Sequence, residues 1–321
     1  MIFVKYLITV VIVVFLSVKA SHYVDLLDKK TNLSGAFLGG IMLSAVTSLP
    51  ELFTSLTSVF LVGEPDMCLG NVLGSDLFNL AALATITLVY FKGFNKSVFS
   101  SSYRMVAFAV LAIYISLGLN FIGAINFSVF TVSITSLFII ATYAVGVKYL
   151  SAASDVISDE EELKIQASKS SPLSVKQVGT RFFFAGLGII VFSILLTEYT
   201  DQVADRLNIG AGFAGALFLG IATSLPEVTS TITLFKMKNY NIAIGNIIGS
   251  NLFNFIILAL ADVISLSEEL YAFPDLQIKV LEICGLIATP LFYVLIKTRN
   301  KTLRAACSVG IIGSYFAFLL I

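Results

Sequence analysis

The chain carries little charge, few cysteines and a single histidine. Asp, Glu, Lys and Arg make up 12% of its 321 residues, and 57% are hydrophobic; the mean hydropathy is +0.95. Because soluble domains contain about 25% charged residues, this composition indicates an integral membrane protein. The net charge of zero gives no sign of nucleic-acid binding. Three scattered cysteines and one histidine predict neither a disulfide framework nor a resident metal cluster or cofactor.

Ten apolar stretches are long enough to cross a bilayer, which takes about 17 to 25 residues. The sequence therefore predicts an all-α membrane protein with ten transmembrane helices, at residues 2–21, 35–62, 66–90, 104–122, 126–149, 179–200, 210–236, 240–265, 276–297 and 303–320. The first stretch has an alternative interpretation. Lys5, the apolar run and the Val18-Lys19-Ala20 sequence are also typical of a cleaved signal peptide.

Lys and Arg fall unevenly on the two sides of these spans. When the connections are numbered alternately from the N-terminus, one set holds three basic residues and the other holds the remaining 17 of the 20. Cytoplasmic connections carry the excess of basic residues in membrane proteins. We therefore expect a multi-pass protein of the cell membrane, with both termini extracellular and a cytoplasmic Ser-rich, charged linker at residues 151–178.

Two segments of the chain are near copies of each other. Residues 47–51 and 223–227 both read TSLPE, and GNVLGSDLFN at 70–79 corresponds to GNIIGSNLFN at 245–254. Five spans separate the copies, so they cross the membrane in opposite directions. Inverted repeats of this kind are the sequence sign of a secondary transporter with its site at mid-membrane. The glycines of these segments, spaced as GxxxG at Gly70 and Gly74, favour close helix packing.

The expected organisation follows from this duplication. It consists of a first five-helix repeat at 1–150 with its motif at 39–86, the linker at 151–178, and a second repeat at 179–321 with its motif at 215–262.

Each copy places a proline beside an intramembrane glutamate. Pro50 and Pro226 free backbone carbonyls of the preceding turn, and in a membrane such oxygens need a partner or line a cavity. Polar residues then recur along one helical face in four stretches, namely Ser44, Thr47, Glu51, Ser55 and Ser58; Asn71, Ser75 and Asn79; Thr223, Glu227 and Thr231; and Asn246, Ser250 and Asn254. Their oxygens are hard ligands that suit Ca²⁺, Mg²⁺ or Na⁺.

The two glutamates predict exchange of cations. Carboxylates inside a membrane are functional by default, and two of them facing each other in a dry site carry a charge of −2. Moving that charge through an occluded state is costly, whereas one Ca²⁺, several Na⁺ or two protons neutralise it. Such a carrier can change the side to which its site is open when cations are bound but not when the site is empty. This property leads to antiport. Ser55, Ser58, Ser230 and Thr231 are expected mainly to join neighbouring helices.

The paired TSLPE and GN-x-x-GS-x-x-x-N units resemble the two alpha-repeats of the calcium/cation antiporter superfamily, most closely its sodium/calcium exchanger branch. This resemblance implies ten helices, a site between the second, third, seventh and eighth, and sliding of the first and sixth past the rest. It implies Glu51 and Glu227 as shared ligands of Ca²⁺ and Na⁺. The resemblance also implies neutral ligands, namely Thr47, Ser48, Ser75, Asn79, Thr223, Ser224, Ser250 and Asn254.

Asp76 departs from the pattern. Some relatives carry an aspartate where Asn254 stands, whereas this chain has a carboxylate at Asp76, opposite Asn251 and one residue off the Ser75–Asn79 stripe. Three roles stay open for it: a third cation ligand, a determinant of proton or potassium specificity, or the buried partner of a hydroxyl.

The sequence thus predicts a secondary active transporter and not an enzyme. We expect alternating access in which Na⁺ influx drives Ca²⁺ efflux, with Ca²⁺, Na⁺ and the bilayer as the partners. An H⁺-coupled or K⁺-dependent exchanger on the same fold is the alternative. A channel lined by the polar stripes fits less well. An enzyme using the two glutamates as acid and base also fits less well, because acid and base need dissimilar surroundings.

Overall fold

The computed structural model describes residues 2–31, 43–125, 127–154, 173–236, 238, 240–265, 270–271 and 274–320. These residues are almost all helical, apart from one small antiparallel hairpin. In chain order the elements are α1 (Ile2–Thr31), α3 (Leu43–Thr47), α4 (Leu49–Thr57), η2 (Ser58–Val62), α5 (Pro65–Val89), α6 (Phe91–Phe94), α7 (Ser101–Phe121), β1 (Ser128–Val129), β2 (Val132–Ser133), α8 (Ile134–Ser154), α10 (Val175–Leu207), α11 (Ala211–Ala214), η3 (Gly215–Leu219), α12 (Gly220–Lys236), α13 (Tyr240–Ser265), α14 (Leu276–Lys297) and α15 (Lys301–Leu319). The segments η2 and η3 are single π-helical turns.

Eight segments of the described chain are long and apolar enough to cross a membrane. They are Ile2–Ala20 of α1, the helices α5, α7, α10, α13, α14 and α15, and the continuous stretch Ala211–Lys236 formed by α11, η3 and α12. The expected spans 35–62 and 126–149 contain two shorter apolar segments, Leu49–Val62 and Ile134–Tyr149. Residues 35–42 lie outside the described residues. The predicted helical membrane class is confirmed, and the count of ten spans stays a prediction.

Several expected boundaries differ from the structure. The helix α1 continues to Thr31 and α10 continues to Leu207, beyond the expected ends at residues 21 and 200. The helix expected over 126–149 begins only at Ile134, because the β1–β2 hairpin occupies the residues before it. Phe130 at the tip of this hairpin has a φ of 59° and is 99% exposed. The helix expected from residue 179 begins earlier, at Val175, where Ser174 and Gln177 form a capping box. Most of the expected linker, residues 155–172, lies outside the described residues.

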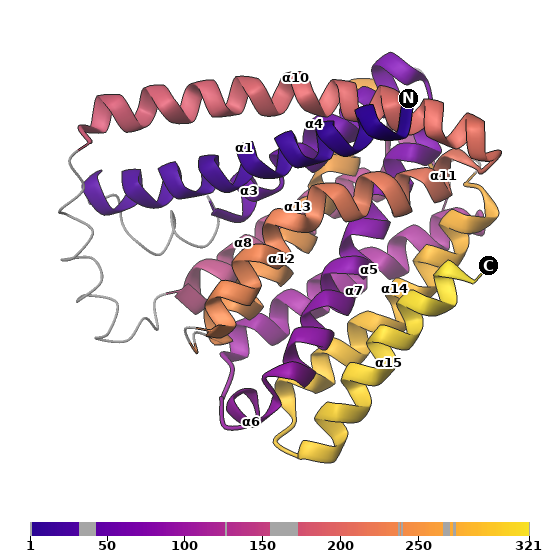
Figure 1. Ribbon diagram of the computed structural model, residues 1–321. Coiled ribbons are helices and arrows are strands. Elements are labelled where there is room, and N and C mark those ends of the chain that lie inside the picture. Colours follow the sequence, from indigo (N-terminus) through magenta and orange to yellow (C-terminus); the bar gives the residue numbers. More distant parts are fainter. Residues whose placement is uncertain are drawn as a thin grey trace.

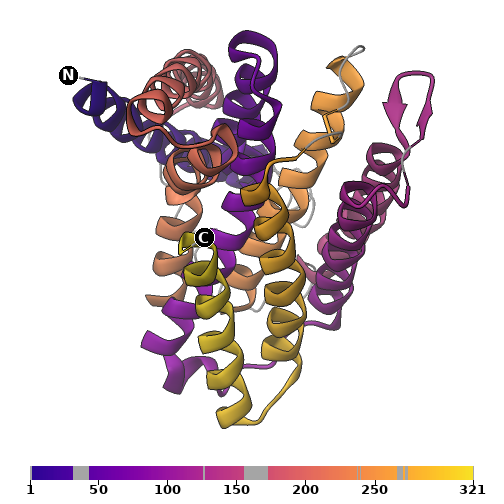
Figure 2. The ribbon, with the colours of Figure 1, turned by 90° about the vertical axis from the view of Figure 1, so that its right-hand side faces the viewer.

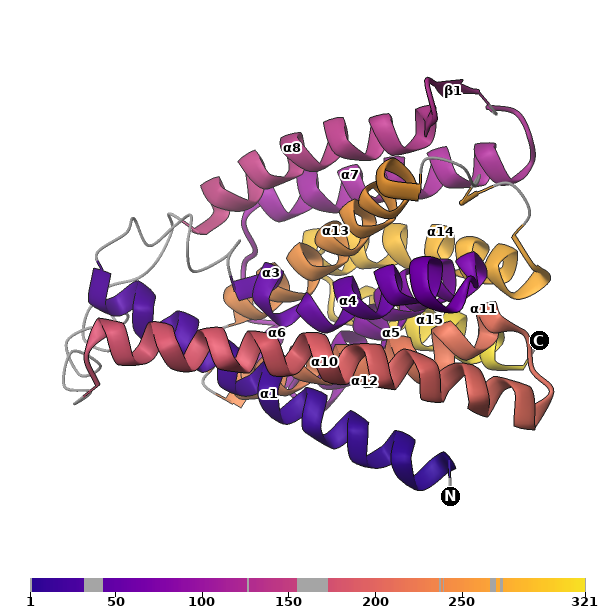
Figure 3. The same cartoon turned by 90° about the horizontal axis from the view of Figure 1, so that it is seen from above.

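The helices form a central bundle with one helix pair on each of two opposite sides. The long helices α1 and α10 run side by side along one side, and α7 and α8 lie on the other (Figures 1 and 3). The view in Figure 2 shows α5 between these pairs, with α14 and α15 beside it. Every side chain of α5 from Met67 to Leu77 is buried, so α5 lies at the centre of the molecule.

Small residues allow α5 to touch the start of the second motif. A Cβ atom added at Gly74 would lie only 2.5 Å from the Cα atom of Ala216 in η3. A Cβ at Gly70 would collide with the carbonyl of Gly212, and one at Gly220 would lie 2.9 Å from the backbone nitrogen of Ser75. These contacts bring the backbone of α5, which carries part of the first motif, against the backbone of the second motif, as close packing at small residues permits.

One buried arginine joins the connection before α15 to the end of α6 and the residues that follow it. Arg304 of α15 is 1% exposed. Its guanidinium donates to the carbonyls of Thr298, Phe94 and Ser97 at 2.8, 2.9 and 3.3 Å. It also lies 5.3 Å from the ring centroid of Phe94 and 5.4 Å from that of Phe99. The planar guanidinium thus joins the start of α15 to the turn after α6.

Candidate cation-binding site

The two prolines have different local effects. In the first copy α3 ends at Thr47, Ser48 forms a turn, and Pro50 lies in the first turn of α4. The freed Thr47 carbonyl accepts a hydrogen bond from Ser17 Oγ of α1 at 3.4 Å. In the second copy α12 continues through Pro226, and the irregular turn is η3, which precedes it. The sequence copies are therefore alike, while the break lies at a different place in each.

The structure brings Glu51 and Glu227 together. They are 1% and 0% exposed, and their carboxylates are close enough to act on each other electrostatically. Ser224 Oγ donates to Glu51 Oε1 at 3.3 Å, and Ser48 Oγ donates to Glu227 Oε1 at 3.2 Å. Each glutamate is thus held by a hydroxyl from the other copy of the motif.

Further hydroxyls lie near the two carboxylates. Thr223 interacts with the Glu51 carboxylate and Thr47 with that of Glu227. Ser250 of α13 also donates to Glu227 Oε1, at 3.4 Å. Ser75 of α5 donates instead to the carbonyl of Gly220 at 3.3 Å. Ser44 lies in α3, but its side chain is outside the described part of the structure.

Two amides attach the glutamate helices to their neighbours. Asn71 Nδ2 of α5 donates to Ser55 Oγ at 2.8 Å, to Thr54 Oγ1 at 2.9 Å and to the Glu51 carbonyl at 3.3 Å. In the second copy Asn246 Nδ2 contacts Thr231 Oγ1 and the Glu227 carbonyl, both at 3.5 Å. These residues position the backbone that carries each glutamate. Their equivalence in the repeat was the signal for this role.

Asp76 joins a second polar cluster between α5 and α13. Asn254 Nδ2 donates to Asp76 Oδ1 at 2.9 Å, and Asn251 Nδ2 donates to the Asp76 carbonyl at 3.0 Å. Asn79 Nδ2 donates to Asn251 Oδ1 at 3.0 Å. All four side chains are fully buried. The described partner of the Asp76 carboxylate is therefore an amide, and Asn251 is a member of the cluster that the stripe pattern missed.

The oxygens left over in these clusters are all acceptors. Among the site residues described above, six buried oxygens have no hydrogen-bond partner, namely Glu51 Oε2, Glu227 Oε2, Asp76 Oδ2, Asn79 Oδ1, Asn246 Oδ1 and Asn254 Oδ1. Buried acceptors without donors are costly unless a cation completes them. No group of three or more His, Cys, Asp or Glu that could hold a metal occurs in the described residues. The donor set, a pair of carboxylates with neutral oxygens, suits a hard cation such as Ca²⁺ or Na⁺.

Acidic residues gather at the end of the bundle where α5 and α14 begin. Partial burial and the nearby carboxylates of Asp201 and Asp205 raise the pKa of Glu64. Asp66 Oδ2 accepts a hydrogen bond from the Asp275 backbone nitrogen at 3.3 Å. A local excess of negative charge attracts cations to this end.

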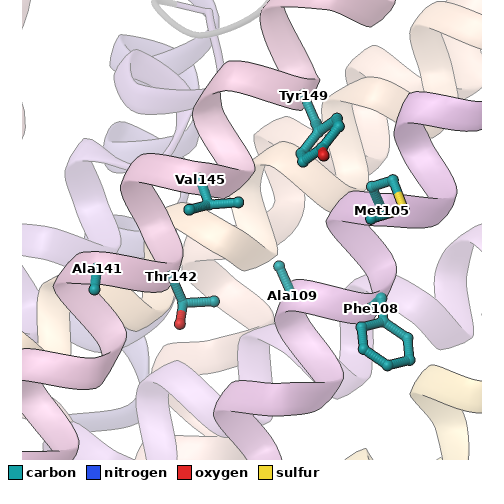
Figure 4. Close-up of a pocket in the computed structure, with 7 residues that line it drawn as sticks. All are labelled: Met105, Phe108, Ala109, Ala141, Thr142, Val145 and Tyr149. Carbon is teal, nitrogen blue, oxygen red and sulfur yellow. The ribbon is translucent and has the colours of Figure 1, made fainter.

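A shallow groove elsewhere has different chemistry. It has a volume of about 260 Å³ and lies between α7 and α8, where it is lined mainly by apolar side chains such as Met105, Phe108 and Val145 (Figure 4). No carboxylate lines it, so it is separate from the candidate cation site.

Comparisons with known proteins identify relatives of this chain. A family model described as sodium/calcium exchanger protein matches residues 2–151 and 180–321. The inner membrane protein YrbG of Escherichia coli strain K12 is 24% identical over 227 residues, which cover 69% of this chain and 66% of YrbG. The chain thus spans just under two thirds of that relative.

Solved structures show the same fold. The H⁺/Ca²⁺ exchanger CAX is 16% identical with a TM-score of 0.73, covering 99% of this chain and 87% of CAX. The sodium-calcium exchanger NCX_Mj, soaked with 10 mM Na⁺, is 17% identical with a TM-score of 0.63, covering 100% of this chain and 99% of NCX_Mj.

Proposed function

Because the chain belongs to the sodium/calcium exchanger protein family, we propose that it is a secondary antiporter that exchanges Ca²⁺ for Na⁺ at the Glu51–Glu227 site. The family is one of exchangers, and cation antiport is its chemistry. Na⁺ influx driving Ca²⁺ efflux is the finer proposal. The cations are transported substrates.

The main observation behind this proposal is that each glutamate accepts a hydrogen bond from a serine hydroxyl of the other motif copy. Each carboxylate keeps one oxygen, Oε2, without any donor, although both residues are almost fully buried. Two uncompensated carboxylates cannot remain ionised in a dry site without a positive charge between them. One Ca²⁺ or several Na⁺ neutralise the pair, whereas the negative charge of an empty site opposes the conformational change that exposes it to the other side of the membrane. This favours obligatory exchange.

We assign the ligands from the same geometry and from the family pattern. Glu51 and Glu227 provide the charge. The proposed neutral ligands are Ser44, Thr47, Ser48, Ser75, Asn79, Thr223, Ser224, Ser250 and Asn254, with Asp76 as a third carboxylate. Oxygens of these types surround Ca²⁺ in flexible cages of six to eight ligands.

The same proposal includes the architecture. Ten spans would form two inverted repeats at 1–150 and 179–321, with both termini extracellular and the linker 151–178 cytoplasmic. The α1–α10 pair, which runs along one side of the bundle (Figure 3), would slide past the remaining helices to expose the site alternately to each side.

A second candidate counter-ion is H⁺. Asp76 adds a third buried carboxylate, whose Oδ2 atom has no partner, and the solved exchanger CAX, which shares the fold, is described as an H⁺/Ca²⁺ exchanger. Intramembrane carboxylates commonly serve proton relays.

Purified protein in liposomes tests the proposal. Ca²⁺ uptake is measured with an outward Na⁺ gradient, an outward H⁺ gradient, or neither. Uptake that requires outward Na⁺ supports Na⁺/Ca²⁺ exchange, and uptake that follows only pH supports the second candidate. Ca²⁺ uptake without a counter-ion on the far side would contradict antiport and indicate a channel.

A further inference from the structure

Glu282 is a buried carboxylate outside the site described above. It lies in α14, is 5% exposed, and its Oε1 atom has no hydrogen-bond partner. It packs against Gly118 of α7, where an added Cβ would lie 2.5 Å from Oε1. The inverted counterpart of this helix, the expected span 104–122, contains no acidic residue. Glu282 is therefore an acid that the duplicated cation site does not account for.

Tyr114 of α7 is near both Glu282 and Asp76. Its side chain is fully buried on α7, and its hydroxyl has no partner. The ring packs against Gly285 of α14, where an added Cβ would contact it, and stands edge-on to Phe255 of α13 with centroids 5.0 Å apart. Tyr114 interacts electrostatically with both Asp76 and Glu282. Three helices thus bring three polar groups near one another, each with an unpartnered atom.

Among the residues that the structure describes, no basic side chain neutralises Glu282. The ionisable side chains on α14 and on the helices packed against it, in the described residues, are Asp66, Cys68, Asp76, Tyr103, Arg104, Tyr114, Lys279, Cys284, Tyr293, Lys297, Lys301, Arg304, Cys307 and Tyr315. None of the lysines or arginines in this set acts on Glu282. Tyr114 is the group of this set that interacts with it electrostatically.

The surroundings suit a proton better than a metal ion. Ca²⁺ and Na⁺ need several oxygen ligands, whereas Glu282 packs against Gly118 and its Oε1 atom has no hydrogen-bond partner. An unpaired carboxylate inside a membrane becomes neutral by binding a proton, and such residues mark proton pathways.

We propose that Glu282 is a proton-binding site, coupled through Tyr114 to the cation site. A cation bound near Asp76 favours the ionised form of Glu282, so cation binding releases the proton; by reciprocity, proton binding at Glu282 weakens cation binding. This inference rests on the proposed antiport function, and it favours H⁺ as a counter-ion.

Proton release on Ca²⁺ binding tests the coupling. Purified full-length protein in weakly buffered detergent is titrated with Ca²⁺, and released protons are followed with a pH-indicator dye. Wild type releases more protons per Ca²⁺ than Glu282→Gln. Glu282→Asp, which keeps a carboxylate, recovers the proton release of wild type. Tyr114→Phe reduces release, whereas Tyr315→Phe, which removes another buried unpartnered tyrosine hydroxyl beside α14, leaves it unchanged. Equal release by wild type and Glu282→Gln overturns the proposal.

Two further measurements separate this inference from the proposed function. In liposomes, pH-driven Ca²⁺ uptake falls on the order of a hundredfold in Glu282→Gln, as loss of a positioned proton-transfer group predicts; undiminished uptake overturns the proposal. If wild type neither binds nor transports Ca²⁺, the antiport function fails, and infrared titration then decides on Glu282 alone. A carboxylic-acid band that titrates in wild type and is absent in Glu282→Gln supports the proton site, and identical spectra overturn it.

Discussion

Ser48 and Ser224 each contact the glutamate of the other motif copy, at 3.2 and 3.3 Å. Neither glutamate is therefore held by its own copy alone. A hydrogen bond from a hydroxyl to a carboxylate satisfies one oxygen but supplies no positive charge. The remaining Oε2 atoms, which have no hydrogen-bond partner, are the acceptors that the proposed cation would contact.

Removal of one charge is the sharpest residue-scale test. Glu51→Gln keeps the shape of the side chain and leaves a single carboxylate at Glu227. We expect Ca²⁺ affinity to fall about a hundredfold or more, on the order of 3 kcal/mol, because breaking a buried charge pair costs this much. Isothermal titration calorimetry in detergent measures the change.

Glu198→Gln is the matched control. Glu198 lies exposed on α10, so its replacement removes the same charge away from the site. Its Ca²⁺ affinity should equal that of wild type. If Glu51→Gln binds Ca²⁺ as tightly as this control, the Glu51–Glu227 pair is not the cation site.

At the scale of elements, α5 matters because its small residues meet the second motif at backbone distance. Gly70 faces the Gly212 carbonyl of α11, and Gly74 faces Ala216 of η3. The contact places Asn71 and Ser75, which lie on the same helix, against Thr223 and Gly220. Spacing between these elements therefore controls the geometry of the site.

Gly70→Ala should disturb that contact. The added methyl group collides with backbone that cannot move as a flexible side chain would, and overpacking of this kind costs about 1 to 3 kcal/mol. We expect a lower unfolding temperature in detergent together with weaker Ca²⁺ binding. Gly313→Ala on α15, where an added Cβ meets nothing within 4 Å, should unfold at the same or a higher temperature, since alanine favours helix. Equal unfolding temperatures for both variants would contradict the tight α5 contact.

At the scale of the whole molecule, the proposed antiport rests on two copies of one motif that are predicted to face opposite sides of the membrane. Their direction depends on the basic residues of the connections, which the sequence places mainly on one side. The native cysteines Cys68, Cys284 and Cys307 are buried, so introduced cysteines can report on accessibility.

Ser128→Cys and Ser168→Cys test this orientation. Ser128 is exposed in strand β1, on the side predicted to be extracellular, and Ser168 belongs to the linker predicted to be cytoplasmic. A membrane-impermeant maleimide applied to intact cells should label Ser128→Cys and label Ser168→Cys only after lysis. The reverse pattern would invert the proposed topology, and labelling of both in intact cells would contradict the predicted spans.

Hydropathy and duplication by themselves determined the membrane class, the repeat and the choice of Glu51 and Glu227 as candidates. These features are local, because apolar run length, GxxxG spacing and a repeated TSLPE can be read without knowing which helices touch. The same patterns indicated that Pro50 and Pro226 free backbone carbonyls, but they did not predict the end of α3 at Thr47, since one continuous span was expected over 35–62.

Only tertiary structure decided the contacts across the chain. Ser48 donates to the glutamate of the other motif copy, and Asn251 donates to the Asp76 carbonyl; both hydrogen bonds join residues more than a hundred positions apart. The interaction of Tyr114 with Glu282 and Asp76 likewise joins separate helices. The different breaks at Ser48 and in η3, and the late start of α8, likewise followed from packing. A periodic pattern specifies which face of a helix is polar, and the neighbour that meets this face depends on how all the helices pack together.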